Sequence, residues 1–256
     1  MKKIYPAILF FALITLLINC GDDGSSDAFP LERKYWTPED YRDVNSELSS
    51  LKFNEKELPN LDNPKTSPIF KKIVDTTNFS IVASDDQLGI KHRSEFTSDM
   101  FDQYKDLVSA YSGIDRKDKY QYPVEFVEIL KFGLALQVYY IKTTNENNIK
   151  NSEDPQAQEV VNLIKRNEDV LISNYDLYIG YINYEDRFND NALSSYSEGL
   201  RDFFPKLIAN VVPNGNYTDM LNKIENMLKK SKNQLIITQL QNIQSIIKNK
   251  QPNSAS

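Results

Sequence analysis

The chain of 256 residues contains one cysteine, one histidine and eight glycines. A single cysteine cannot form an intramolecular disulfide, and one cysteine with one histidine is too few for a structural zinc site. The glycines form neither a phosphate-binding loop nor a dinucleotide fingerprint, and no calcium-binding loop with regularly spaced aspartates is present. We therefore expect no metal and no cofactor.

Residues that could support catalysis are also scarce. His92 lies between Lys91 and Arg93, a setting typical of a surface residue, and no Gly-x-Ser-x-Gly turn occurs. Glu125 and Glu128 are three residues apart and share one helix face, but the positive start of a helix favours acidic residues there without any catalytic role. Glycosidases instead place two carboxylates across a cleft. The sequence therefore indicates no catalytic residue, and we expect a non-enzymatic protein.

Acidic residues outnumber basic ones, 36 against 30, and the formal net charge is −6. A net negative chain argues against nucleic acid as a partner. The charge is also uneven, because residues 220–250 contain a group of lysines and a single acid, Glu225. We expect this basic C-terminal segment to lie on an acidic body, so that the two signs compensate each other.

The N-terminus has a basic start, residues 1–3, followed by an apolar run over residues 4–18. This order is typical of a signal peptide, and the run is shorter than the ~20 residues that a membrane-spanning helix needs. The run ends in Leu17-Ile18-Asn19-Cys20, which resembles the lipobox of bacterial lipoproteins, although Asn19 stands where a small residue is usual. The resemblance implies cleavage before Cys20 and lipidation of that cysteine.

A lipidated Cys20 implies that the protein is attached to a membrane of the bacterial cell envelope, namely the outer membrane on its periplasmic or its surface-exposed face. Several acyl chains anchor stably because each buried methylene contributes about 0.8 kcal/mol. We divide the chain into a signal peptide (1–19), the lipidated cysteine with a flexible tether (20–36), a single helical domain (37–250) and a frayed tail (251–256).

Helical patterns dominate the expected domain. Thr37 and Pro38 are typical of a helix start, and residues 124–141 are apolar on nearly all sides, as in a central buried helix. Residues 79–83 fit either a strand or a buried linker, and residues 145–152 read as a polar loop. We predict an all-α protein, an irregular bundle of seven or eight helices. The expected helices cover about residues 37–51, 67–74, 94–113, 123–141, 152–182, 190–207 and 218–248, the last with a break near 231–233.

Tyr175, Tyr178, Tyr181 and Tyr184 are spaced by three residues, which moves slowly around a helix. Tyrosine combines a large apolar ring with a polar tip and suits wet interfaces and sugars. Two interpretations remain open. The rings line the edge of the bundle with their hydroxyls in water, or they form a binding surface, for which these four residues are the candidates.

Three functions are compatible with these features. The leading hypothesis is a membrane-tethered, non-enzymatic binding or scaffold lipoprotein whose partner is a protein or a surface ligand. An envelope hydrolase acting on glycans or peptidoglycan is an alternative, based on the acidic and tyrosine-rich composition. A protective or immunity lipoprotein that captures a basic effector is the other alternative, because an acidic body would attract such a partner.

Overall fold

The computed structural model describes residues 28–84 and 89–250. Cys20, the expected signal peptide and the tail at 251–256 lie outside these described residues. Within them the regular elements are helices, so the predicted all-α bundle is confirmed. No helix in the described part of the chain is both long and apolar enough to cross a membrane.

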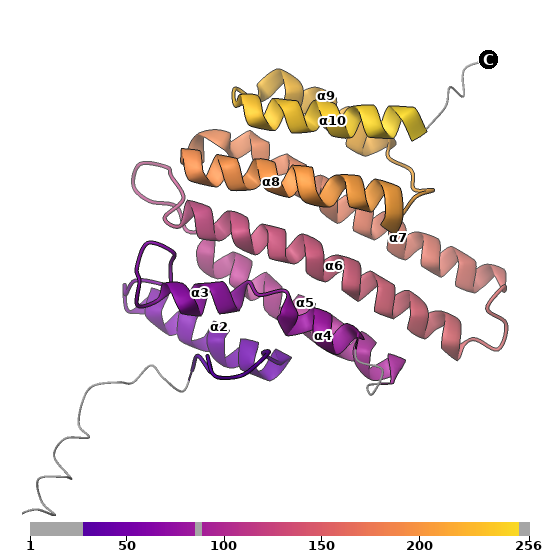
Figure 1. Cartoon of the computed structure of the whole chain (residues 1–256), viewed down its shortest axis with the longest axis horizontal. Coiled ribbons are helices and arrows are strands. Elements are labelled where there is room, and N and C mark those ends of the chain that lie inside the picture. The colour runs from indigo at the N-terminus through magenta and orange to yellow at the C-terminus, as the bar shows by residue number, and fades with distance from the viewer. Residues whose placement is uncertain (1–27, 85–88, 251–256) are drawn as a thin grey trace, which may run out of the picture.

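Figure 1 shows the helices lying roughly side by side along one long axis, from α2 at one edge to α9 and α10 at the other. Two short helical segments of other types, η1 (Tyr181–Arg187) and η2 (Leu207–Val211), extend α7 and α8. The α-helices are α2 (Pro38–Phe53), α3 (Ser67–Ile73), α4 (Thr77–Ser84), α5 (Ile90–Tyr111), α6 (Pro123–Asn151), α7 (Gln158–Gly180), α8 (Asp190–Lys206), α9 (Thr218–Lys230) and α10 (Gln234–Lys250).

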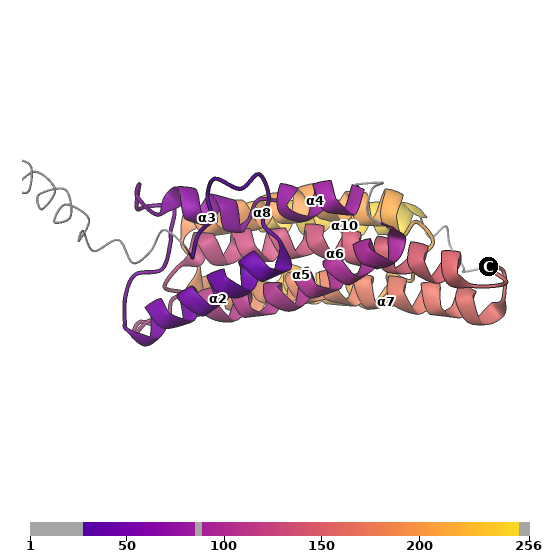
Figure 2. The ribbon, with the colours of Figure 1, turned by 90° about the horizontal axis from the view of Figure 1, so that it is seen from below.

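The helix α6 is central, as its apolar sequence predicts. It contacts α4, α5, α7 and α8, and Phe126, Val127 and Ile129 are fully buried. Figure 2 shows α3, α4 and α8 on one side of the molecule and α5 and α7 on the other. The last two helices cover α7 and α8, because α9 packs on α7 and α10 packs on α8.

Three expectations about local structure are wrong. Residues 77–84 form the helix α4 where a strand or linker was expected, and α6 continues through the expected polar loop to Asn151. The end of α6 is held by distant partners, since the hydroxyls of Thr97 and Thr143 lie 2.7 Å apart and Asn167 donates to Asn145 at 2.7 Å. Residues 28–36, assigned to the tether, pack on the bundle, where Trp36 is buried.

Candidate functional site

The four tyrosines do not form one surface. Tyr175 and Tyr178 are buried, Tyr181 is half-buried and Tyr184 is exposed. The Tyr175 hydroxyl donates to the Leu134 carbonyl at 3.0 Å. The predicted binding surface is therefore wrong for Tyr175 and Tyr178. A step of three residues turns about 60° short of a full helical turn, so successive rings leave the core face of α7.

Tyr178 has a structural role between α7 and α8. Its ring stacks on Tyr196, with centroids 4.5 Å apart and an interplanar angle of 1°. The Tyr178 hydroxyl donates to the Tyr196 carbonyl at 3.1 Å, and the Tyr196 hydroxyl donates to the Tyr178 carbonyl in return. Two aromatic rings joined in this way fix the position of α7 against α8.

Tyr178 and Tyr181 also line a groove between α5 and α7, with α6 as its floor. The groove has a volume of about 140 Å³. Its walls are apolar and aromatic, with two amide side chains among them. It is lined by Phe101, Tyr104, Leu130, Leu134, Gln137, Asn174, Leu177, Tyr178 and Tyr181. We call this the α5–α7 groove. Of the two accessible tyrosines of the predicted surface, Tyr181 lines the groove and Tyr184 does not.

Gln137 gives this groove an unused hydrogen-bond acceptor. The residue is buried, and no donor within the described part of the chain reaches its Oε1 atom. A buried polar atom without a partner costs about 1–3 kcal/mol. A partner that donates a hydrogen bond into the groove would recover this energy.

An apolar ridge runs along α7 beside the groove. Leu163, Val170 and Leu177 are exposed and lie seven residues apart, and Tyr184 follows seven residues later in η1. A spacing of seven drifts only about 20° per step around a helix, so the three α7 side chains form one line. We call these three α7 residues the apolar ridge. Sequence reasoning missed it, although the seven-residue spacing was visible.

The opposite wall of the groove is built from stacked aromatic rings. Phe101 of α5 stacks on Tyr140 of α6, with centroids 5.4 Å apart, and on Tyr104, 5.9 Å away. The Lys105 ammonium lies 5.1 Å from the centre of the Phe101 ring. Burial raises the pKa of Tyr104 and of Tyr181 above the ordinary value for tyrosine, so both hydroxyls are neutral at physiological pH.

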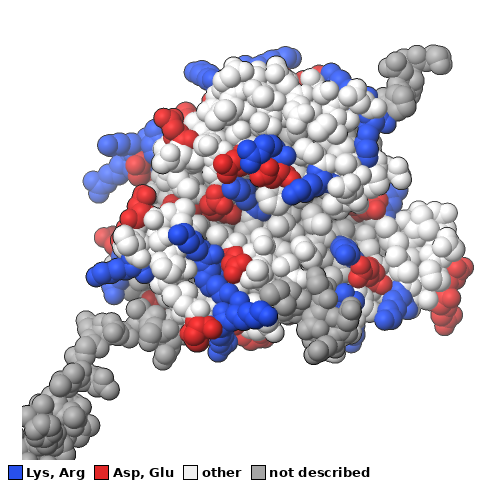
Figure 3. Space-filling model, viewed as in Figure 1, with Lys and Arg blue, Asp and Glu red and all other residues white. Residues whose placement is uncertain are grey.

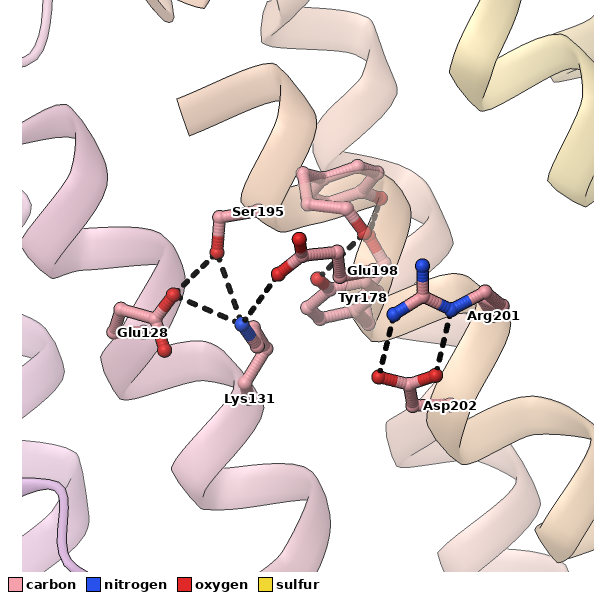
Figure 4. Close-up of polar contacts among 8 residues, drawn as sticks. Glu128, Lys131, Tyr178, Ser195, Glu198, Arg201 and Asp202 are labelled. Atoms are coloured by element: carbon pink, nitrogen blue, oxygen red, sulfur yellow. Dashed lines mark hydrogen bonds and ion pairs between the residues drawn. The ribbon is translucent and has the colours of Figure 1, made fainter. Parts of the chain in front are cut away.

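The second group of functional side chains is a charged cluster between α6 and α8 (Figure 4). The Lys131 ammonium lies 2.9 Å from Glu128 Oε1 and 3.5 Å from Glu198 Oε2, and it donates to Ser195 Oγ at 3.1 Å. The Ser195 hydroxyl donates to Glu128. Arg201 and Asp202 form a separate ion pair on α8, at 2.8 Å.

This cluster links α6 to α8, and the structural role of holding the two helices together accounts for it. The Ser195 hydroxyl is buried and Lys131 lies between two carboxylates, as expected of an ion pair that links α6 to α8. The acids predicted to share a helix face have different partners, because Glu125 Oε1 accepts from the Leu61 N–H at 2.7 Å. His92 is exposed and lies 3.3 Å from Glu95. Among the described residues, no group of histidine and acidic side chains could hold a metal ion.

The lysines of the C-terminal helices contact the body in part as expected. Lys223 of α9 lies 2.5 Å from the Asp176 carboxylate of α7. Lys230 donates to Asn183 at 2.7 Å, and the Ser231 hydroxyl donates to Glu185 at 2.6 Å. On the face drawn in Figure 3, acidic and basic side chains are mixed.

No protein-family model matches the chain, and neither the curated proteins nor the solved structures include a significant match. The functional assignment therefore rests on the residues themselves.

Proposed function

We propose that the protein is a lipid-anchored, non-enzymatic binding protein of the bacterial cell envelope that holds an apolar helix of a protein partner along the α5–α7 groove. The anchor is supported by the lipobox-like Leu17-Ile18-Asn19-Cys20. The binding role is supported by one observation above all, the apolar ridge beside a groove with aromatic walls.

Helices pack by fitting a ridge of side chains into a groove of the partner helix. The surface along α7 offers both features to a partner, because Leu177 belongs to the ridge and also lines the groove. Leu177 is 62% exposed, and an exposed apolar side chain at the edge of an apolar groove is typical of an interaction surface. A partner helix with apolar residues three, four and seven positions apart would cover them.

The partner helix also needs a polar group at one position. Gln137 Oε1 has no donor within the described residues and is enclosed, so a serine, asparagine or lysine side chain of the partner could supply one where the helix crosses α6 once the Gln137 side chain shifts toward the groove. The neutral hydroxyls of Tyr104 and Tyr181 can donate to the same partner. Such polar contacts inside an apolar interface set the register of the helix, because a misplaced helix leaves the acceptor unsatisfied.

The hydrolase alternative finds less support, since Glu125 and Glu128 bind different partners and Lys131 is paired with two carboxylates. Capture of a basic effector differs from our proposal in its response to salt. Binding along the apolar ridge should persist as ionic strength rises, whereas electrostatic capture by acidic residues should weaken.

Replacing Cys20 with serine should abolish lipid attachment and release the protein from membranes, because no acyl acceptor would remain at the expected cleavage site. Metabolic labelling with palmitate followed by membrane fractionation measures both effects. Protease added to intact cells then separates a surface-exposed domain from a periplasmic one. An unlabelled wild-type protein would contradict the anchor.

Replacing Leu177 with aspartate should weaken partner binding about tenfold or more, because a partner would then bury an unpaired carboxylate in an apolar contact. Val161 provides the matched control, since it is an exposed apolar residue of α7 that lies off the ridge. Both variants should unfold at nearly the wild-type temperature.

A photo-crosslinking amino acid placed at either position in living cells reads out the contact directly. We expect a discrete adduct from position 177 and none from position 161, with the partner identified by mass spectrometry. Equal labelling from both positions would argue against the ridge as the binding surface. An adduct containing this chain alone would identify the partner as a second copy.

A further inference from the structure

A second groove lies on the other side of α5, between α5 and α2. Its volume is about 610 Å³, which is large enough for several sugar rings, and its chemistry is opposite to that of the α5–α7 groove. Its lining is mostly polar and includes hydroxyls, amides and charges of both signs. The residues used below are Arg42, Asn45, Phe53, Gln103 and Asp106. We call it the α2–α5 groove.

Asn45 carries an unused acceptor at this groove. Its side chain is 7% exposed, and its Nδ2 atom donates to the Gln103 carbonyl at 3.0 Å and to Gln103 Oε1 at 3.1 Å. No donor among the described residues reaches its Oδ1 atom. Both donors of the amide are already used and Oδ1 is itself enclosed, so a hydroxyl or N–H from outside can donate to it once the Asn45 side chain shifts toward the groove.

Phe53 ends α2 at one end of the same groove, and its side chain is 87% exposed. An aromatic ring with an open face beside a polar groove suits a ligand with one apolar face and a polar edge. Lys52 fixes this end of the groove, since its ammonium donates to the Ser109 carbonyl of α5 at 3.1 Å.

We propose that the α2–α5 groove binds a saccharide. A sugar ring can place its C–H face on Phe53 and its hydroxyls in the groove. One hydroxyl donates to Asn45 Oδ1, and the others pair with the planar polar groups of Gln103, Asp106 and Arg42. The site is independent of the apolar ridge, because it uses the opposite side of α5.

Other ligand classes fit the groove less well. A free phosphate or carboxylate ion could pair with Arg42 or Lys52, but when ionised it has no hydrogen to give to Asn45 Oδ1 and no apolar face for Phe53. An apolar helix would leave the hydroxyl and amide groups of the lining without partners. A saccharide supplies hydrogen-bond donors, hydrogen-bond acceptors and an apolar face in one molecule. The lining of the groove has partners for all three.

The test is a titration of the full-length protein, purified in a detergent without a sugar headgroup, with two sets of oligosaccharides. One set contains neutral oligomers of glucose and of N-acetylglucosamine. The other alternates N-acetylglucosamine with N-acetylmuramic acid and therefore carries carboxylates that Arg42 could pair. Saturation-transfer NMR detects binding, and calorimetry measures the affinity. Binding of either set supports the proposal. A preference for the acidic set would indicate that Arg42 pairs with the carboxylates of the oligosaccharide.

Phe53→Ala should weaken binding about tenfold or more, equivalent to about 1.4 kcal/mol, and should leave the unfolding temperature unchanged because the ring is exposed. Asn45→Ala should also weaken binding, although loss of its bonds to Gln103 could alter stability. Leu235→Ala, which removes another exposed apolar side chain outside both grooves, should bind as the wild type does. Failure of both sets to bind at millimolar concentration, or equal binding by Phe53→Ala, would overturn the proposal.

Discussion

Replacing Asn78 with alanine is expected to lower the free energy of unfolding by about 3–5 kcal/mol, because the buried Trp36 N–H would lose its partner and two further hydrogen bonds would be lost. Asn78 Oδ1 accepts from the Trp36 N–H at 2.9 Å. Its Nδ2 atom donates to the Tyr41 hydroxyl and to the Lys72 carbonyl, each at 2.7 Å. The Tyr41 hydroxyl in turn donates to the Ile73 carbonyl at 2.6 Å.

This network explains how the N-terminal quarter of the described chain is held. Asn78 lies in α4 and is fully buried, and its partners come from α2, from the end of α3 and from the segment before α2. Trp36 and Tyr41 pack edge to face, with centroids 5.6 Å apart. Loss of Asn78 should therefore loosen four segments at once, including the helix α2 that forms one wall of the α2–α5 groove.

Urea unfolding followed by circular dichroism measures the effect. Asn216→Ala is the matched control, because Asn216 is exposed and accepts only a local bond, from the Thr218 N–H at 3.0 Å. That exposed local bond should contribute about 1 kcal/mol or less. Both residues stand in an Asn-x-Ser/Thr triplet. Similar losses from the two variants would show that the buried network contributes little.

The sequence was most informative where a helix begins with its own local signals. Thr37 and Asp40 form the capping box that starts α2, and the break expected near 231–233 separates α9 from α10. Local signals failed where distant contacts decide the structure. The polar end of α6 stays helical because Thr97 of α5 and Asn167 of α7 bind it. Pro205 lies inside α8, which ends at the next residue, Lys206, and η2 begins at Leu207.

The candidate sites were harder to predict for a related reason. The three-residue spacing identified tyrosines of α7, but it could not say that Tyr175 and Tyr178 face the core. Leu163, Val170 and Leu177 look like core residues in sequence, and only the packing of α6 and α9 on α7 shows that they face outward. Phe53 and Asn45 line one groove together with Gln103 because α2 packs on α5, and no local sequence pattern indicates that pairing.

Replacing Gly199 with alanine should lower the free energy of unfolding by about 2–3 kcal/mol, even though alanine is the better helix former by about 1 kcal/mol. An added Cβ atom would lie 2.2 Å from the Tyr178 hydroxyl oxygen and 2.9 Å from the ring carbon that bears it. Tyr178 cannot move aside easily, because its ring is stacked on Tyr196 and each hydroxyl binds the other residue's carbonyl.

Gly180→Ala is the matched control on the partner helix. Gly180 has helical geometry, with φ of −60°, and the nearest atom to its added Cβ is the Lys223 ammonium nitrogen at 3.9 Å. This substitution should therefore be neutral or stabilising by up to about 1 kcal/mol. Thermal unfolding of both variants makes the comparison, and an unchanged midpoint for Gly199→Ala would show that the α7–α8 contact can relax. Because Tyr178 also lines the α5–α7 groove, Gly199→Ala should weaken partner binding as well, whereas Gly180→Ala should not.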